Sequence, residues 1–275
     1  MSFGYRDSEE NCLSLGIVVC RTMTSDDTPS ASFEQITDVA AESPTLIEGL
    51  PGLGMVASIA VDQITDQLNL SMHGHVQIDD FPPVASFSEG RVRETIRVYT
   101  GDDPGVMTLQ SDVPIPPRSV RALSRCVLDD LSKEFERAIF LAGAPAQTEQ
   151  ELGEVTGVAT TDELEEDLRS RDITLAEESG SLGGVTGGLV SACYQDDVPA
   201  AVLIVRSDPR LPDPGAARSV IENALEPLVE FDIDTNELQE QAEDIQQQKQ
   251  QVAEQLQQML GGQEAETAPD PSMYQ

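Results

Sequence analysis

Short apolar runs alternate with amphipathic stretches along most of the chain, from Phe33 to about residue 233. The run "PTLIEGL" is typical of a buried strand that ends at Gly49 and is followed by a glycine-containing turn. The next segment, "MVASIAVDQITDQL", predicts a helix because its apolar residues recur at intervals of three and four. One face of this predicted helix carries Val56, Ile59, Ala60, Ile64 and Leu68. The pattern thus opens with a strand, a turn and a helix.

The middle of the chain continues with short strands and a second helix. Four β-rich runs are separated by Pro, Gly and Asp, which predicts separate strands: "HVQI", "PVASFSE", "RETIRVYT" and "GVMTLQS". The segment "RSVRALSRCVLDDLSKEFE" has apolar residues at helical spacing, and "RAIFLAGA" after it is typical of a buried strand. The unit of helix and strand therefore repeats.

The second half of the domain shows the same alternation. "EVTGVATT" predicts a strand, and Thr160 with Glu163 has the spacing of a capping box at the start of a helix. "GGVTGGLVSACYQ" predicts a helix, and "PAAVLIVRS" is the most apolar strand candidate. Asp213 is a predicted N-cap, since Pro214 follows at the first helical position.

This order of elements predicts an α/β fold. Strands that alternate with helices of this length form a mixed, largely parallel sheet that is flanked by helices on both faces. We predict one such domain over residues 32–233. Residues 1–31 are interpreted as an N-terminal extension and linker, because "TSDDTPSAS" is polar and contains proline.

Residues 234–260 have a different pattern, which predicts a coiled-coil-like helix capped by Asp234 and Glu237. Its apolar residues form a stripe in a heptad register, which Lys249 interrupts. The predicted oligomerisation positions are Leu238, Ala242, Ile245, Val252, Leu256 and Met259. Because a lone polar helix is marginal in water, we expect a partner helix and hence a homo-oligomer. The alternative is a solvated helix that lies on its own domain.

Residues 261–275 predict a flexible tail, since "GGQEAETAPDPS" is rich in helix-breaking and polar residues. The tail ends in Met273, Tyr274 and Gln275, a hydrophobic residue, a tyrosine and a residue of any type. An apolar anchor, an aromatic anchor and a terminal carboxylate can together enter a pocket on a partner protein. The alternative is a frayed terminus.

The charge of the chain excludes several classes of partner. Fifty Asp and Glu against sixteen Lys and Arg give a formal net charge of -34, which repels nucleic acid and anionic membranes. Such a surface fits a salt-rich, halophilic cytoplasm, because the Debye length falls to roughly 3 Å at 1 M salt; an ordinary acidic cytosolic protein is the alternative. No run reaches the length of a membrane span. We expect a cytoplasmic protein.

The candidate chemistry does not indicate an enzyme, a cofactor or a metal. The glycine-rich loop 49–54 could bind phosphate, but its spacing is GxxGxG, it has no P-loop lysine, and Glu48 precedes it. A tight turn with close packing of helix on sheet is favoured there. The segment "GSLGGVTGGL" could also hold an anion at a helix start, but Glu177 and Glu178 precede it, so a close-packing role is favoured. His73 and His75 have no third defined ligand, and the four cysteines form no CxxC pair.

Five segments in order resemble the archaeal proteasome assembly chaperone family, homologues of the second eukaryotic proteasome assembly chaperone subunit. They are "LIEGLPGLGMVAS", "FPPVASFSEGRVRETIRVY", "VTGVATTDEL", "GGVTGGLVSACYQ" and "DPRLPDPGAARSVIENAL". The resemblance implies an α/β domain without a cofactor, ATP-independent action, homo-oligomers, and, in some members, a C-terminal tail that binds between proteasome α-subunits. That tail corresponds to Met273, Tyr274 and Gln275.

The resulting prediction is an ATP-independent proteasome assembly chaperone or docking factor that binds proteasome α-subunits or the α-ring through its tail. One alternative is a regulator or activator of the mature 20S proteasome. Another, from a different class, is a nucleotide-processing enzyme that uses loop 49–54 as its phosphate loop.

Overall fold

The computed structural model of the chain describes residues 29–37, 41, 43–79 and 81–266. Eight strands form one sheet in the order β1-β3-β6-β7-β2-β8-β10-β9, and β4 and β5 form a separate hairpin. The strands are β1 (Ala31–Gln35), β2 (Thr45–Gly49), β3 (Ser71–Ile78), β4 (Ser86–Ser88), β5 (Arg91–Arg93), β6 (Ile96–Asp102), β7 (Gly105–Ser111), β8 (Arg137–Pro145), β9 (Val155–Ala159) and β10 (Ala200–Ser207).

The sheet is mixed, as predicted, and its parallel part occupies the centre. The pairs β2 with β7, β2 with β8, and β8 with β10 are parallel. The four other pairings, which involve the strands toward the two edges, are antiparallel. Parallel strands are usually buried on both faces, and every residue of β2 is buried accordingly.

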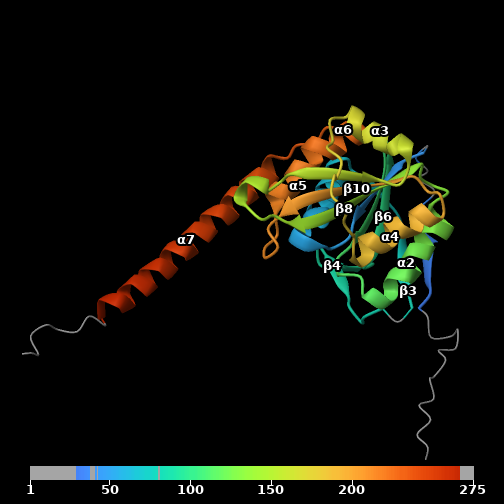
Figure 1. Cartoon of the computed structure of the whole chain (residues 1–275). Helices are drawn as coiled ribbons and strands as arrows, with labels where there is room; N and C mark the ends of the chain where they lie inside the picture. The colour runs from blue at the N-terminus through green and yellow to red at the C-terminus, as the bar shows by residue number, and fades with distance from the viewer. Residues whose placement is uncertain (1–28, 38–40, 42, 80, 267–275) are drawn as a thin grey trace, which may run out of the picture.

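Helices cover both faces of the sheet (Figure 1). The α-helices are α1 (Val56–Gln67), α2 (Val120–Cys126), α3 (Asp162–Ser170), α4 (Gly184–Gln195), α5 (Pro214–Val220), α6 (Glu226–Val229) and α7 (Asn236–Glu266). The 3-10 turns are Leu53–Met55, Pro117–Ser119 and Glu149–Glu151, and the π-helical turns Val127–Leu131 and Ile221–Leu225 extend α2 and α5.

Two apolar cores lie on opposite faces of the sheet. Side chains of α1 and α5 pack in one core, and side chains of α2 and α4 pack in the other. On β2, Ile47 enters the first core and Leu46 the second, because consecutive strand residues point to opposite faces. The buried strands predicted from apolar runs therefore form the shared wall between the cores.

One predicted helix start is confirmed and one is wrong. Asp213 caps α5, since its carboxylate accepts the Ala216 N–H at 3.0 Å and Pro214 follows. The cap of α3 is Thr161, whose hydroxyl accepts the Leu164 N–H at 3.3 Å. Thr160, the predicted cap, instead accepts the Ala200 N–H at 2.8 Å and so joins β9 to β10. Two adjacent threonines made the choice ambiguous by one residue.

The last helix differs from its prediction at both ends. α7 begins at Asn236, where Asp234 accepts the Asn236 N–H at 2.9 Å; Glu237 accepts from the Gln241 side chain rather than completing a capping box. α7 continues through Gly261 and Gly262 to Glu266. Glycine costs about 1 kcal/mol in a helix interior but keeps its N–H, so helical hydrogen bonding can pass through it. Residues 267–275, with Met273, Tyr274 and Gln275, lie outside the described residues.

Candidate functional site

The first half of α7 packs against its own domain. Leu238 is 2% exposed and belongs to the core on the α1 and α5 face. Ala242 and Ile245 are half-buried, and α5 is the element that α7 contacts most. These residues follow helical spacing, so a single stripe of α7 faces the domain. Part of the predicted heptad stripe is therefore covered within the chain, as in the alternative of a helix that lies on its own domain.

Lys249 ends this contact with an ion pair. Its Nζ lies 2.8 Å from the carboxylate of Asp208, in the loop after β10. The hydrogen bond from Lys249 lowers the pKa of Asp208 below its ordinary value, with a further contribution from the Arg210 N–H. The cation that interrupts the heptad pattern thus binds the domain.

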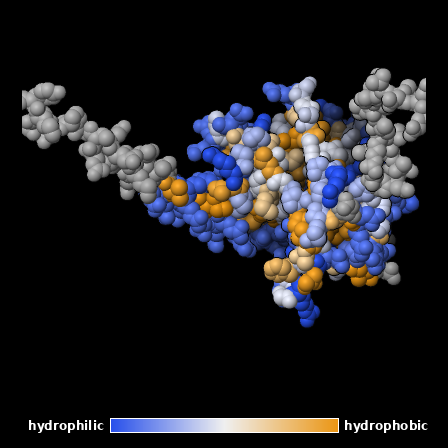
Figure 2. Space-filling model, turned by 90° about the horizontal axis from the view of Figure 1, so that it is seen from below, coloured by the Kyte–Doolittle hydropathy of each residue, from blue (hydrophilic) through white to orange (hydrophobic). Residues whose placement is uncertain are grey.

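Beyond Lys249 the helix projects away from the domain (Figure 1). Val252 is 64% exposed. In Figure 2, hydrophobic residues are visible along the root of α7 among hydrophilic ones. Leu256 and Met259 lie in α7, but their side chains are outside the described residues. Oligomerisation through Val252, Leu256 and Met259 stays a prediction.

The two halves of α7 should differ in their contribution to stability. Leu238→Ala is expected to lower the free energy of unfolding by about 2–5 kcal/mol, because it leaves a cavity in the core. Val252→Ala removes an exposed side chain and should change that free energy by less than about 0.5 kcal/mol. Denaturant unfolding of both full-length variants in molar KCl measures the difference; equal effects would contradict the docking of α7.

A second candidate site is a crevice at the carboxyl ends of the parallel strands β2, β8 and β10. This is the edge at which open α/β sheets usually bind their ligands. The cavity has a volume of about 790 Å³ and lies between loop 51–53, the ends of β8 and β10, and loop 176–183 with the start of α4. Its apolar walls are formed by Leu53, Val158, Leu182, Val185 and Ile204. Both glycine-rich segments of the sequence meet here.

The glycines of these segments serve two purposes. A Cβ on Gly49 would lie 2.5 Å from the Val61 Cβ, and one on Gly188 would lie 2.3 Å from Val120, so close packing is confirmed at both. Gly54 has φ 65 and lies against Ser207, which confirms the tight turn. By contrast, a Cβ on Gly52, Gly180, Gly183 or Gly184 would meet nothing within 4 Å. Packing does not explain these four, and they line the crevice with backbone alone.

Glu48 is buried at the end of β2, beside the crevice, with 0% exposure. Its carboxyl group accepts the Leu50 N–H at 3.0 Å, and it lies 3.4 Å from both the Leu141 nitrogen and the Thr186 hydroxyl. Burial raises the pKa of Glu48 to about 8, against the smaller lowering by these hydrogen bonds. Glu48 is therefore mainly protonated at neutral pH, which removes the expected repulsion of an anion by this residue.

Other candidate chemistry is sparse in the described part of the chain. Arg206 is the only cation among the residues that line the crevice. His73 Nε2 lies 2.6 Å from Glu134, and His75 Nε2 lies 3.0 Å from the Gln77 amide, so each has a structural partner. No group of three or more His, Cys, Asp or Glu among the described residues could hold a metal ion. None of the described helices is both long and apolar enough to span a membrane.

The chain thus forms a single α/β domain, with a crevice at the carboxyl ends of its parallel strands and a projecting C-terminal helix. A family model described as "PAC2 family" matches residues 46–253, which is most of the chain. The chain belongs to the PAC2 family.

Two solved structures share the fold over nearly their whole length, and one curated relative is similar in sequence. The crystal structure of Pyrococcus furiosus PbaA, an archaeal homologue of proteasome-assembly chaperone, is 25% identical with a TM-score of 0.70, and the match covers 83% of this chain and 99% of that chain. Pyrococcus furiosus PbaB, an archaeal proteasome activator, is 19% identical with a TM-score of 0.74, covering 82% and 99%. The Methanocaldococcus jannaschii protein MJ0106 is 27% identical over 217 residues, 79% of this chain and 88% of its own.

Proposed function

We propose that this protein is an ATP-independent assembly chaperone or docking factor that binds proteasome α-subunits through Met273, Tyr274 and Gln275. The observation that carries the proposal is membership of the PAC2 family together with the match to nearly all of PbaA, a homologue of proteasome-assembly chaperone. The projecting α7 supports it, because this helix carries the end of the described chain away from the domain (Figure 1). The protein would act by binding rather than by catalysis.

Self-association would strengthen such binding. A tail of three residues offers one aromatic anchor, one apolar anchor and one carboxylate, so a single contact is weak. Several tails held together by a homo-oligomer would bind a ring of α-subunits with much higher avidity, because each later contact is intramolecular. In this proposal Val252, Leu256 and Met259 of α7 help to gather the tails.

Deleting Met273, Tyr274 and Gln275 is expected to abolish the capture of α-subunits while leaving the fold intact. The measurement is a pull-down with purified α-subunits in molar KCl, since dilute buffer exposes the acidic chain to self-repulsion. Tyr194→Ala is the matched control, because Tyr194 is a 68% exposed tyrosine on the domain and its loss should leave capture unchanged. Undiminished capture by the deletion variant would contradict the proposal. If assembled 20S particles hydrolyse peptides faster when this protein is added than without it, the protein is instead a regulator of the finished proteasome.

A further inference from the structure

The β4 and β5 hairpin exposes an apolar pair that the described part of the chain leaves uncovered. Phe87 is 75% exposed and Val92 is 78% exposed, more than any other large hydrophobic side chain among the described residues. The two residues lie directly opposite each other in the hairpin. Exposed apolar groups gathered in this way usually mark a surface that binds a partner.

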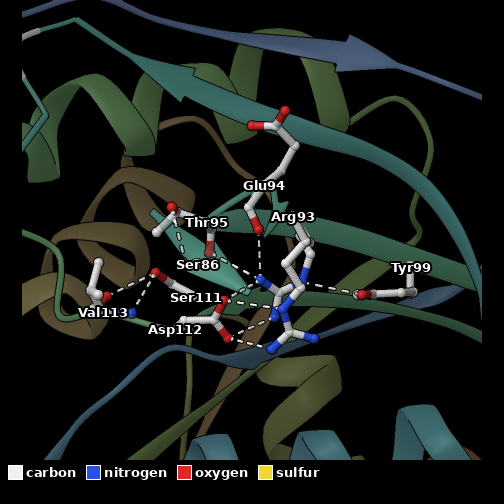
Figure 3. A network of polar contacts seen from close by, with 9 residues as sticks. Ser86, Arg93, Glu94, Thr95, Tyr99, Ser111, Asp112 and Val113 are labelled. Atoms are coloured by element: carbon white, nitrogen blue, oxygen red, sulfur yellow. Dashed lines mark hydrogen bonds and ion pairs between the residues drawn. The ribbon is translucent and has the colours of Figure 1, made fainter. Parts of the chain in front are cut away.

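The hairpin is held rigidly at its base (Figure 3). Asp112, after β7, accepts hydrogen bonds from Arg93 at 2.7 Å and from Arg97 at 2.6 Å. The Ser86 hydroxyl donates to the Thr95 hydroxyl at 3.2 Å. An isolated two-stranded hairpin is marginally stable in water, so these contacts fix a conformation that would otherwise fluctuate. A rigid hairpin loses little entropy when it binds.

The crevice beside α4 is a concave counterpart on the same chain. It holds about 790 Å³ between apolar walls, and Gly52, Gly180 and Gly183 leave its backbone accessible. The hairpin of the same chain lies elsewhere, since Ser88 and Glu89 share a cavity with Asp62 and Asp66 of α1, on the opposite face of the sheet. One chain therefore presents both a projecting apolar element and an apolar recess, at separate places.

We propose that the β4 and β5 hairpin of one copy inserts Phe87 and Val92 into the glycine-lined crevice of a second copy. Charge supports this occupant: the hairpin carries exposed Glu89 in its turn and exposed Arg91 at the start of β5, and the crevice carries Arg206 and Glu178, so each acid has a base of the other copy to pair with. Such attraction matters in a chain with a net charge of -34, in which most other surface contacts between copies repel.

This contact is head to tail, because different surfaces of the two copies meet, and such contacts generate closed rings or open chains. A stable interface buries about 800 Å² per partner, so the hairpin supplies the anchor and the neighbouring loops supply the remaining area. The contact involves neither the C-terminal tail nor a proteasome subunit.

Replacing both apolar residues tests the convex side of the contact. The full-length double variant Phe87→Ser, Val92→Ser is expected to self-associate about 100-fold more weakly than the unaltered protein, because both buried anchors are lost. Sedimentation and light scattering in molar KCl measure the mass over a range of concentrations. Tyr194→Ser is the control, which removes an exposed aromatic side chain elsewhere on the domain and should keep the assembled mass. An unaltered protein that stays monomeric, or a double variant that assembles normally, overturns the inference.

Filling the crevice tests the concave side without touching the hairpin. Gly183 has φ -109, which any residue adopts, and a Cβ there meets nothing within 4 Å, so Gly183→Trp should fold and block insertion. We expect the same loss of assembly as for the hairpin variant. In a background without Cys12 and Cys20, mixing a Phe87→Cys chain with a Ser181→Cys chain should give a disulfide-linked dimer that neither gives alone. Normal assembly of Gly183→Trp, or the absence of the mixed dimer, overturns the inference.

Discussion

Asp112→Ala is expected to lower the free energy of unfolding by about 3–5 kcal/mol. The reason is Arg97, whose side chain is only 2% exposed. Its guanidinium donates to both oxygens of Asp112, at 2.6 and 3.0 Å. Removing Asp112 leaves a buried guanidinium without its counter-ion, although the Glu94 carbonyl at 2.7 Å remains as an acceptor.

The pKa of Asp112 reflects the same contact. Partial burial acts to raise this pKa, but the hydrogen bonds from Arg97, Ser86 and Arg93 and the charge of Arg97 together outweigh it, so the pKa lies below its ordinary value. The contribution of this depressed pKa to stability is therefore present at neutral pH and is lost as the pH falls through the pKa of the folded state.

Denaturant unfolding in molar KCl gives the magnitude, and Arg93→Ala provides the matched control. Arg93 also binds Asp112, but its side chain is 38% exposed, so its removal should cost at most about 1 kcal/mol. Asp112→Ala should also loosen the β4 and β5 hairpin, which is measurable as faster amide exchange in residues 86–93. A cost of Asp112→Ala no greater than that of Arg93→Ala would show that the pairing of Arg97 contributes little.

The sequence predicted many of the helices and strands, because the spacing of apolar residues shows which face of a helix or strand is buried. β2, α1, β8 and β10 lie where the apolar runs place them. The Arg97 network could not be predicted in the same way. Arg97 and Asp112 are brought together by the antiparallel register of β6 and β7, in which Arg97 lies opposite Gln110. Register depends on contacts between strands, which a single sequence does not show.

The heptad pattern of apolar residues in α7 shows a second limit of prediction from the sequence. A heptad pattern indicates that one helical face is covered, but it does not say by what. Leu238 is covered by its own domain, whereas Val252, in the same register, is exposed. The signal for this difference is Lys249, which interrupts the stripe where the intramolecular contact ends.

The burial of Glu48, and hence its raised pKa, was also not predicted from the sequence. The acid lies between Ile47 and Gly49 in an apolar run, and from its type alone it is expected to carry a charge that repels anions. Leu46 and Leu50 are buried with it, and the strand is covered on both faces, so water does not reach the carboxyl group. An acid inside a run typical of a central parallel strand is a usable signal of a raised pKa.

Glu48→Gln is expected to remove a pH dependence from the stability of the protein. The pKa of Glu48 is about 8 in the folded chain against an ordinary value of 4.5. Between these values the unfolded chain is ionised at Glu48 while the folded chain keeps the proton. The folded state thus binds more protons, and the free energy of unfolding falls by about 1.4 kcal/mol for each pH unit of rise. The contribution is most favourable below the pKa of the unfolded chain and is lost as the pH rises through the pKa of the folded chain.

Glutamine has the same shape without a titratable proton. Its carbonyl can accept the Leu50 N–H as Glu48 does, and its amide can donate to the Thr186 hydroxyl, while the long contact with the Leu141 N–H at 3.4 Å loses its acceptor. Unfolding at about pH 5.5 and about pH 7.5 in molar KCl should show a slope shallower by about 1.4 kcal/mol per pH unit in Glu48→Gln than in the unaltered protein. Glu178→Gln, which changes an exposed acid at the same crevice, should leave the slope unchanged. If Glu48→Gln keeps the original slope, Glu48 is ionised in the folded chain, and the crevice would then have to stabilise a buried anion instead of an uncharged acid.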